Sequence, residues 1–206
     1  MLGDAELQKL LIDSAKRDAA PVTHRKKATE EDIGTVVGWA LNKNTKACIS
    51  AACIILLSFL AFLRVSEAAC VRKSHLENKG NDIWWLHIPK SKTDQKGKGT
   101  TVAFKVKGIH CTLWNKFMDI IKEETKQFFI FGSASKRKPS ADDLRKRITW
   151  VLSSAGLGHK GLTSHSFRGG AATSALRNGV DQESIKRVGR WKTTSAMLHY
   201  IEPTPI

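Results

Sequence analysis

The sequence has few of the residue patterns that build metal sites, disulfide scaffolds or secreted proteins. Its four cysteines are Cys48, Cys53, Cys70 and Cys111. They contain no C-x-x-C pair, so neither a zinc site nor a disulfide framework is predicted. The N-terminus lacks the continuous apolar run of a signal peptide, and no P-loop or metal-ligand cluster is visible in the sequence. These absences predict an intracellular chain with reduced thiols, no metal and no cofactor.

One uncharged apolar stretch approaches the length of a membrane span. It runs from Ala47 to Leu63, is rich in Ala, Ser and Cys, and ends at Arg64. We predict a buried core helix there and no membrane association. With 206 residues, 41% hydrophobic and 26% charged, the chain fits one globular domain with a short extension.

Acidic residues are scarce relative to basic ones. The sequence has 19 Asp and Glu but 34 Lys and Arg, which gives a formal net charge of +15 at pH 7. An excess of this size favours contacts with phosphodiesters, whereas an enzyme for a small acidic substrate needs only a local basic patch. We therefore expect a nucleic acid partner, with a merely soluble basic protein as the alternative.

The hydrophobic pattern predicts a mainly α domain with a small antiparallel β-sheet, an α+β fold. Thr29 is a typical N-cap, and the acidic residues after it suit the first turn of a helix. β-branched and aromatic runs at 83–89 and 100–106 flank the basic segment KSKTDQKGKG, which predicts a hairpin with a long loop. Helices are predicted at 29–41, 47–63, from about 66, and at 111–127, 140–154, 166–178, 181–188 and 194–201.

The N-terminal residues form a separate unit. Apolar residues at positions 7, 10, 11 and 12 predict a short amphipathic helix, followed by a basic linker broken at Pro21. A single helix of this kind has nothing to pack against within its own segment. We therefore divide the chain into a helical tail with its linker, residues 1–21, and a main domain, residues 22–206.

Arg64 closes a helix that is otherwise uncharged. Its guanidinium must find an anion at the edge of the core, or remain poorly solvated. Glu67 is an internal candidate for that anion. Taken alone, Arg64 fits a structural salt bridge with Glu67 and an anion-binding role equally well.

His165 and Arg168 lie across a predicted helix N-terminus in SHSFRGGAATSAL. Side chains at this spacing share a face where free backbone N–H groups already favour an anion. Gly169 and Gly170 allow another backbone, or a substrate, to approach closely. The combination predicts a phosphate site, although H-x-x-R alone is a common pattern.

Further candidates lie in the predicted hairpin loop and near the C-terminus. The loop lysines are Lys90, Lys92, Lys96 and Lys98. A solvated basic turn is the ordinary interpretation of most of them, with Lys96 and Lys98 contacting phosphate backbone. The segment GRWKTTSAMLHYIEP places Trp191 in a turn and Tyr200, the single tyrosine, on the last helix.

In order and spacing these motifs resemble the catalytic domain of the tyrosine recombinase (integrase) superfamily. The matching segments are FLRVSEAA, PKSKTDQ, SHSFRGG, GRWKT and LHYIEP, and the resemblance extends from roughly Val22 to Pro203. The amino-acid sequences of the segments SHSFRGGAATSALRNGV and IKRVGRWKT most resemble those of recombinases from eukaryotic mobile elements of the Crypton and DIRS kind. The tail, residues 1–21, then resembles the end of a core-binding domain that is otherwise missing.

The resemblance implies a site-specific recombinase or integrase that cuts and rejoins double-stranded DNA through a 3′-phosphotyrosine intermediate. It implies that Arg64 and Arg168 clamp the scissile phosphate with their planar donor pairs. Lys92 would protonate the leaving 5′ oxygen, and His165 would assist proton transfer.

Trp191 would donate its indole N–H or pack against the phosphate, and Tyr200 would attack phosphorus. The phosphotyrosine conserves the phosphoester energy, and the cationic residues offset the charge, so the family's reaction uses neither ATP nor a metal. The resemblance also implies self-association on DNA, and a nuclear location if the source is eukaryotic.

Alternatives stay open at the level of sequence. Lys90 competes with Lys92 for the hairpin role, with Lys90, Lys96 and Lys98 otherwise assigned to DNA binding. A type IB topoisomerase shares the chemistry but relaxes supercoils as a monomer. A non-catalytic basic DNA-binding domain that retains the fold is a second alternative.

Overall fold

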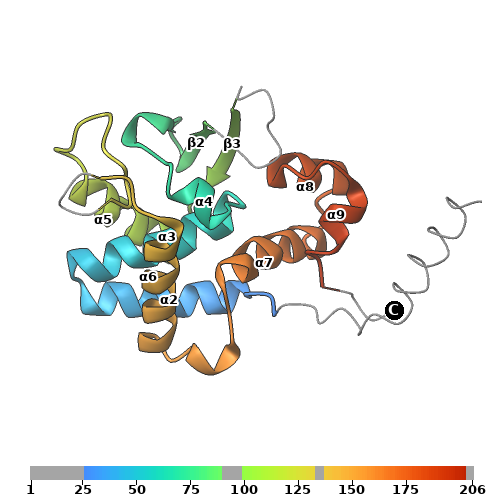
Figure 1. Ribbon diagram of the computed structural model, residues 1–206, viewed down its shortest axis with the longest axis horizontal. Helices are drawn as coiled ribbons and strands as arrows, with labels where there is room; N and C mark the ends of the chain where they lie inside the picture. The colour runs from blue at the N-terminus through green and yellow to red at the C-terminus, as the bar shows by residue number, and fades with distance from the viewer. Residues whose placement is uncertain (1–25, 90–98, 133–136, 203–206) are drawn as a thin grey trace, which may run out of the picture.

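The computed structural model describes residues 26–89, 99–132 and 137–202 (Figure 1). The helices are α2 (Glu30–Lys43), α3 (Lys46–Leu60), α4 (Val65–Ala68), α5 (Ile109–Ile120), α6 (Ala141–Ser154), α7 (Ser164–Arg177), α8 (Gln182–Gly189) and α9 (Thr194–Leu198). The strands are β1 (Leu76–Asn78), β2 (Ile83–Ile88) and β3 (Thr100–Lys105), and the short 3-10 helices are η1 (Lys73–His75) and η2 (Gly158–Lys160). The predicted α+β fold is confirmed. The tail predicted at 1–21 and the loop lysines lie outside the described residues.

Helix α3 occupies the centre of the domain because its sequence carries no charge after Lys46. It contacts α2, α5, α6 and α7, which lie around it in Figure 1. Ile54 and Leu57 are fully buried in this core, and burying such a side chain contributes roughly 1.5–3 kcal/mol. Among the described residues no helix combines the length and the apolar character needed to cross a membrane.

A sharp turn after α3 places Arg64 at the edge of the core. The predicted helix to Leu63 ends at Leu60, and Phe62 adopts a left-handed φ of 52°. The Leu63 N–H donates to the Ser58 carbonyl over 3.0 Å, which closes the helix end. Arg64 then becomes the N-cap of α4.

Strands β2 and β3 form the predicted hairpin. They pair antiparallel, and alternate side chains of β2 are buried, as the period of a half-buried strand requires. Trp114 of α5 packs edge-on against Trp84 and Phe104, with ring centroids 5.5 and 5.4 Å away. Strand β1, which pairs with β2, was not predicted because three residues are too few to show an alternating pattern.

The helix predicted at 111–127 is too long, since α5 ends at Ile120. The Lys73 ammonium donates to the carbonyls of Lys122 and Glu124, the latter over 2.8 Å. The Lys73 N–H donates to the Phe128 carbonyl over 2.9 Å. Hydrogen bonds to a distant segment therefore satisfy backbone groups that a longer helix would have paired internally.

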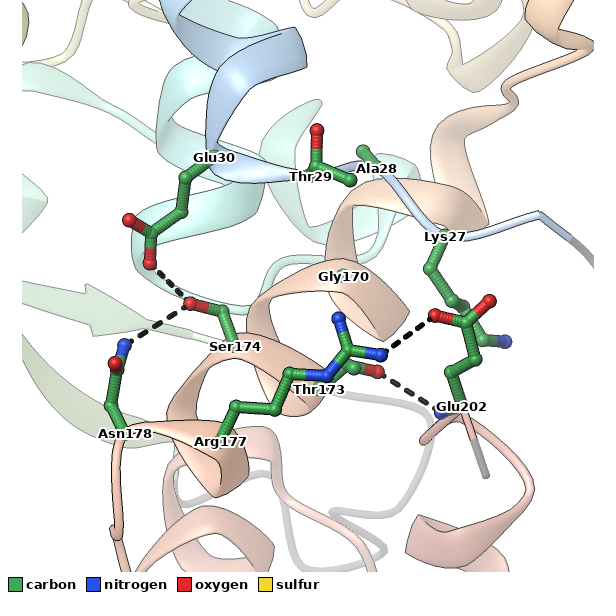
Figure 2. Close-up of a pocket in the computed structure, with 10 residues that line it drawn as sticks. All are labelled: Lys27, Ala28, Thr29, Glu30, Gly170, Thr173, Ser174, Arg177, Asn178 and Glu202. Atoms are coloured by element: carbon green, nitrogen blue, oxygen red, sulfur yellow. Dashed lines mark hydrogen bonds and ion pairs between the residues drawn. The ribbon is translucent and has the colours of Figure 1, made fainter. Parts of the chain in front are cut away.

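Helix α7 packs closely against the segment that precedes α2. The Ala28 N–H donates to the Ser166 carbonyl over 3.0 Å, and Figure 2 shows this segment beside Gly170. A Cβ added to Gly170 would lie 1.9 Å from the Ala28 carbonyl oxygen, and one added to Gly169 would lie 2.9 Å from the Tyr200 carbonyl oxygen. The close approach that the two glycines allow is therefore made by the backbone of this chain, at Ala28 and Tyr200.

We predict that Gly170→Ala destabilises the domain by about 1–3 kcal/mol, the usual cost of overpacking, because the Ala28 carbonyl must move. Gly34→Ala in α2 is the matched control, since its Cβ would meet no atom within 4 Å. That control should stabilise the helix by about 0.5–1 kcal/mol. Urea unfolding followed by circular dichroism measures both, and wild-type stability in Gly170→Ala would contradict the close packing.

Candidate active site

Arg64 and Glu67 form the ion pair that the sequence allowed. The Arg64 guanidinium lies 2.9 Å from Glu67 Oε1, and the Arg64 backbone N–H donates to Oε2 over 2.9 Å. The Glu67 side chain is 2% exposed and the Arg64 side chain 15% exposed. Arg64 therefore makes the structural salt bridge with Glu67, and part of its side chain still reaches the surface.

Arg168 is fully buried beneath two aromatic rings. Its Nη1 donates to the Phe62 carbonyl over 2.7 Å, and its Nη2 donates to the Gly189 carbonyl. The guanidinium carbon lies 4.2 Å from the centroid of the Trp191 ring and 5.6 Å from that of Tyr200. Cation–π attraction of this kind is strongest where water is excluded.

Trp191 and Tyr200 lie side by side over that guanidinium. Their ring centroids are 5.3 Å apart, and the Phe62 ring lies edge-on to the indole with the two centroids 6.3 Å apart. The indole fits because Gly189 has no side chain: a Cβ there would lie 1.7 Å from a Trp191 ring carbon. Gly189 thus sets the position of Trp191.

Two buried N–H groups of this cluster lack an acceptor among the described residues. They are Nε of Arg168 and Nε1 of Trp191. A buried donor without an acceptor costs about 1–3 kcal/mol, so a ligand oxygen at this place would be favoured.

Tyr200 lies beyond the last helix, which corrects the prediction that placed it there. Helix α9 ends at Leu198, and the Tyr200 N–H donates to the Met197 carbonyl over 2.8 Å in the following turn. The next residues are fastened to α7 (Figure 2): the Glu202 N–H donates to Thr173 Oγ1 over 3.1 Å. The turn after α9 therefore holds the backbone before the Tyr200 ring, and the contact with α7 holds the backbone after it.

His165 lies in the first turn of α7, on the same helix as Arg168, and is partly buried. The structure therefore brings Arg64, Arg168, Trp191 and Tyr200 into one cluster and places His165 on an element of that cluster. Lys92, together with the DNA-binding candidates Lys90, Lys96 and Lys98, falls outside the described residues. Their loop joins β2 to β3, whose pairing is described.

Sequence reasoning missed Arg190. Its side chain is buried, its Nη2 lies 2.7 Å from Glu67 Oε2, and the same nitrogen donates to the Phe62 carbonyl over 2.8 Å. Its φ of 58° is left-handed, as the C-cap of α8 requires. The only signal in the sequence was its position next to Trp191 in GRWKT.

Positive charge exceeds negative charge in this cluster. Arg64, Arg168 and Arg190 surround the single carboxylate of Glu67. Burial, and then the charges of Arg64 and Arg190, lower the pKa of Arg168 to about 9. Burial opposes ionisation of Glu67, but Arg190 and the hydrogen bond from Arg64 outweigh it and hold the pKa of Glu67 below its usual value. The arrangement suits an anionic ligand.

Groups of three or more His, Cys, Asp or Glu side chains that could hold a metal do not occur in the described part of the chain. All four cysteines are free thiols. The residues gathered here are donors for an anion.

Solved DNA recombinases share this fold. XerA recombinase is 16% identical, with a TM-score of 0.70 over 91% of this chain and 62% of XerA. XerH recombinase bound to its palindromic difH substrate is 14% identical, with a TM-score of 0.71 over 89% of this chain and 51% of XerH. A lambda integrase dimer bound to a COC′ core site is 13% identical, with a TM-score of 0.64 over 95% of this chain and 55% of that chain. The chain thus spans 51% to 62% of the length of these three structures.

The fold and the arginine–tyrosine cluster define a domain of the tyrosine recombinase class. The sequence profile of the phage integrase family matches residues 29–205, and the chain belongs to this family. Comparison with curated protein sequences finds no match.

We predict that sulfate, compared with chloride at equal ionic strength, raises the melting temperature more in the wild type than in Arg64→Met. Sulfate bound only to the folded state stabilises it by mass action, about 1.4 kcal/mol at ten times its Kd. Arg145→Met is the matched control, because Arg145 is 51% exposed and pairs with Asp142 on α6. Differential scanning calorimetry measures the shifts. The same sulfate effect in all three proteins would argue against an anion site at Arg64.

Proposed function

We propose that this chain is the catalytic domain of a site-specific DNA recombinase or integrase that cuts and rejoins strands through a 3′-phosphotyrosine at Tyr200. The observation that supports the proposal is the convergence of Arg64, Arg168, Trp191 and Tyr200, from distant parts of the sequence, in one cluster of excess positive charge. Membership in the phage integrase family supports the same chemistry. The similar XerH and lambda integrase structures contain DNA, and the latter is a dimer, which supports duplex DNA and self-association as partners.

In the proposed reaction Arg64 and Arg168 bind the non-bridging oxygens of the scissile phosphate. Arg168 is covered by the rings of Trp191 and Tyr200, so phosphate binding requires Tyr200 to move away from the guanidinium. The unpaired Nε of Arg168 and Nε1 of Trp191 are then available to phosphate oxygens. Donors fixed before the reaction stabilise the charge that develops at phosphorus.

Bond exchange then proceeds at one phosphorus atom. The Tyr200 oxygen forms the new P–O bond, the bond to the 5′ oxygen breaks, and Lys92 supplies the proton that the leaving oxygen takes. His165 assists on the attacking side by accepting the proton that the Tyr200 hydroxyl loses. Rejoining reverses these steps with a 5′ hydroxyl as the nucleophile.

The source of the recombinase follows from one segment of its sequence. The similarity of SHSFRGGAATSALRNGV to recombinases of the Crypton and DIRS kind favours a eukaryotic mobile element. A recombinase of that origin would act in the nucleus. The tail at residues 1–21 would then be the end of its core-binding domain.

Tyr200→Phe is expected to abolish a covalent protein–DNA adduct while leaving DNA binding within about twofold, because only the attacking oxygen is lost. A random-sequence pool of nicked duplexes supplies the substrate, since cleavage near the nick releases a short strand and traps the adduct. Denaturing electrophoresis measures the adduct and mobility shift measures binding. An undiminished adduct in Tyr200→Phe would rule out this nucleophile.

The trapped sequence then separates recombination from simple relaxation. Two duplexes that carry it should exchange strands if the chain is a recombinase. Relaxation of a supercoiled plasmid without such exchange would favour the topoisomerase alternative, and absence of any adduct would favour a non-catalytic DNA-binding domain.

A 5′-bridging phosphorothiolate should restore cleavage to Lys92→Ala, because a sulfur leaving group needs no proton. Lys96→Ala and Lys98→Ala should show no selective rescue, and each should reduce the magnitude of the salt slope of binding by about 1. Single-turnover cleavage of matched oxygen and sulfur substrates measures the rescue. If Lys90→Ala were rescued and Lys92→Ala were not, the general acid would be Lys90.

A further inference from the structure

Arg190 is the most buried cation paired with Glu67. The Arg190 side chain is 4% exposed, compared with 15% for Arg64. Glu67 Oε2 accepts from Arg190 over 2.7 Å, whereas Oε1 accepts from the Arg64 guanidinium. A carboxylate this deep in the protein is costly unless it is paired, and Arg190 is the partner that is buried to a similar extent. The more exposed Arg64 is thereby left to share its charge with a ligand.

Arg190 also ties two turns that are far apart in sequence. Its Nη2 donates to the Phe62 carbonyl, over 2.8 Å, and its Nη1 donates to the Val188 carbonyl, over 2.7 Å. The first turn leads to Arg64 and the second leads to Trp191. One side chain therefore fixes the relative position of two groups assigned to the phosphate.

The backbone at Arg190 indicates that this side chain is required. A helix C-cap in the left-handed region is most easily formed by glycine, and L-residues there lose roughly 1–2 kcal/mol. Arg190 nevertheless holds a φ of 58° at the end of α8. The contacts of its side chain with Glu67 and the Phe62 carbonyl offset that strain. This is the pattern expected where the side-chain contacts outweigh the cost of a left-handed backbone.

We propose that Arg190 is a positioning residue of the recombinase site: by neutralising Glu67 and bridging to the Phe62 turn, it holds Arg64 and Trp191 in place for the scissile phosphate. This inference rests on the function proposed above. Arg190 itself does not touch the reacting atoms.

The experiment compares Arg190→Met with the wild type in single-turnover cleavage and in DNA binding. We expect cleavage to fall between about 10-fold and 100-fold, the range for residues that orient a primary ligand. The Kd for DNA should stay within about twofold, because the Arg190 side chain is buried and offers little surface to a phosphate backbone. Arg145→Met, which also removes one positive charge, should change neither quantity.

The pH profile distinguishes positioning from general destabilisation. The charged groups that face Glu67 are Arg64 from α4, Arg168 from α7 and Arg190 from the turn after α8. In Arg190→Met the nearest of these is lost, so the pKa of Glu67 rises and its ionised form exists only at higher pH. Cleavage by the variant should then fall at a higher pH than in the wild type as the solution is acidified, because Glu67 takes up its proton earlier. The double variant Arg190→Met with Glu67→Gln should lose that added pH dependence.

Arg190→Lys provides a second variant that keeps the charge. It should restore the wild-type pH profile but only part of the rate, because an ammonium cannot bridge Glu67 and the Phe62 carbonyl with a planar fork. Arg190→Lys and the double variant also supply the comparison if Arg190→Met does not fold, which circular dichroism shows directly.

The outcomes separate this proposal from the proposed function. If the wild type forms no adduct, the recombinase assignment fails, and the sulfate-induced rise in melting temperature still tests Arg190: it should shrink in Arg190→Met as it does in Arg64→Met. A wild-type rate and pH profile in Arg190→Met would overturn the positioning role. Equal losses of cleavage and DNA binding, with no added pH dependence, would overturn it too and leave Arg190 as a stabilising residue only.

Discussion

The arrangement of this domain around its candidate site depends on one buried carboxylate. Glu67 is 2% exposed, and three arginines from different elements lie around it. Burying a charge costs several kcal/mol unless it is paired, so each partner must be held at hydrogen-bond distance. The packing of α4, α7 and the turn after α8 meets that requirement, and the same packing collects the donors that a phosphate would need.

The Phe62 carbonyl is the second point at which these elements meet. It accepts from Arg168 over 2.7 Å and from Arg190 over 2.8 Å, and Phe62 itself has a left-handed backbone. Two non-glycine residues beside the cluster, Phe62 and Arg190, adopt that conformation, and each stores strain of roughly 1–2 kcal/mol. Such strain persists only where surrounding contacts impose it, and here the arginine contacts do so.

Two aromatic rings cover the Arg168 guanidinium. Trp191 and Tyr200 enclose the Arg168 guanidinium, and Tyr200 in turn depends on backbone contacts with α7 at Gly169. The nucleophile proposed for the reaction is therefore part of the same packing as the arginine that it covers. Binding of an anion at Arg168 and release of the Tyr200 ring would be linked events, because both groups compete for one guanidinium face.

Local sequence signals were sufficient for most elements of the fold. Thr29, Ser140 and Asp181 each cap a helix that begins at the next residue, because their side chains satisfy backbone N–H groups close in sequence. The uncharged run at α3 favoured a core helix, and the alternation in β2 indicated its buried face. The family resemblance named Arg64, Arg168, Trp191 and Tyr200 in advance, and the structure places them together.

Other features were decided by the tertiary structure, since they depend on partners far away in the chain. Helix α5 ends before its predicted end because Lys73 donates hydrogen bonds to carbonyl groups beyond Ile120. Tyr200 lies outside α9 because its backbone packs on α7. Arg190 meets the Phe62 carbonyl across 128 positions of sequence, a pairing that no local pattern encodes. Residue types and their local order were enough to show which side chains carry charge and where most helices begin. Only the folded chain decided which arginine neutralises Glu67 and which is left for a ligand, because that choice depends on relative burial.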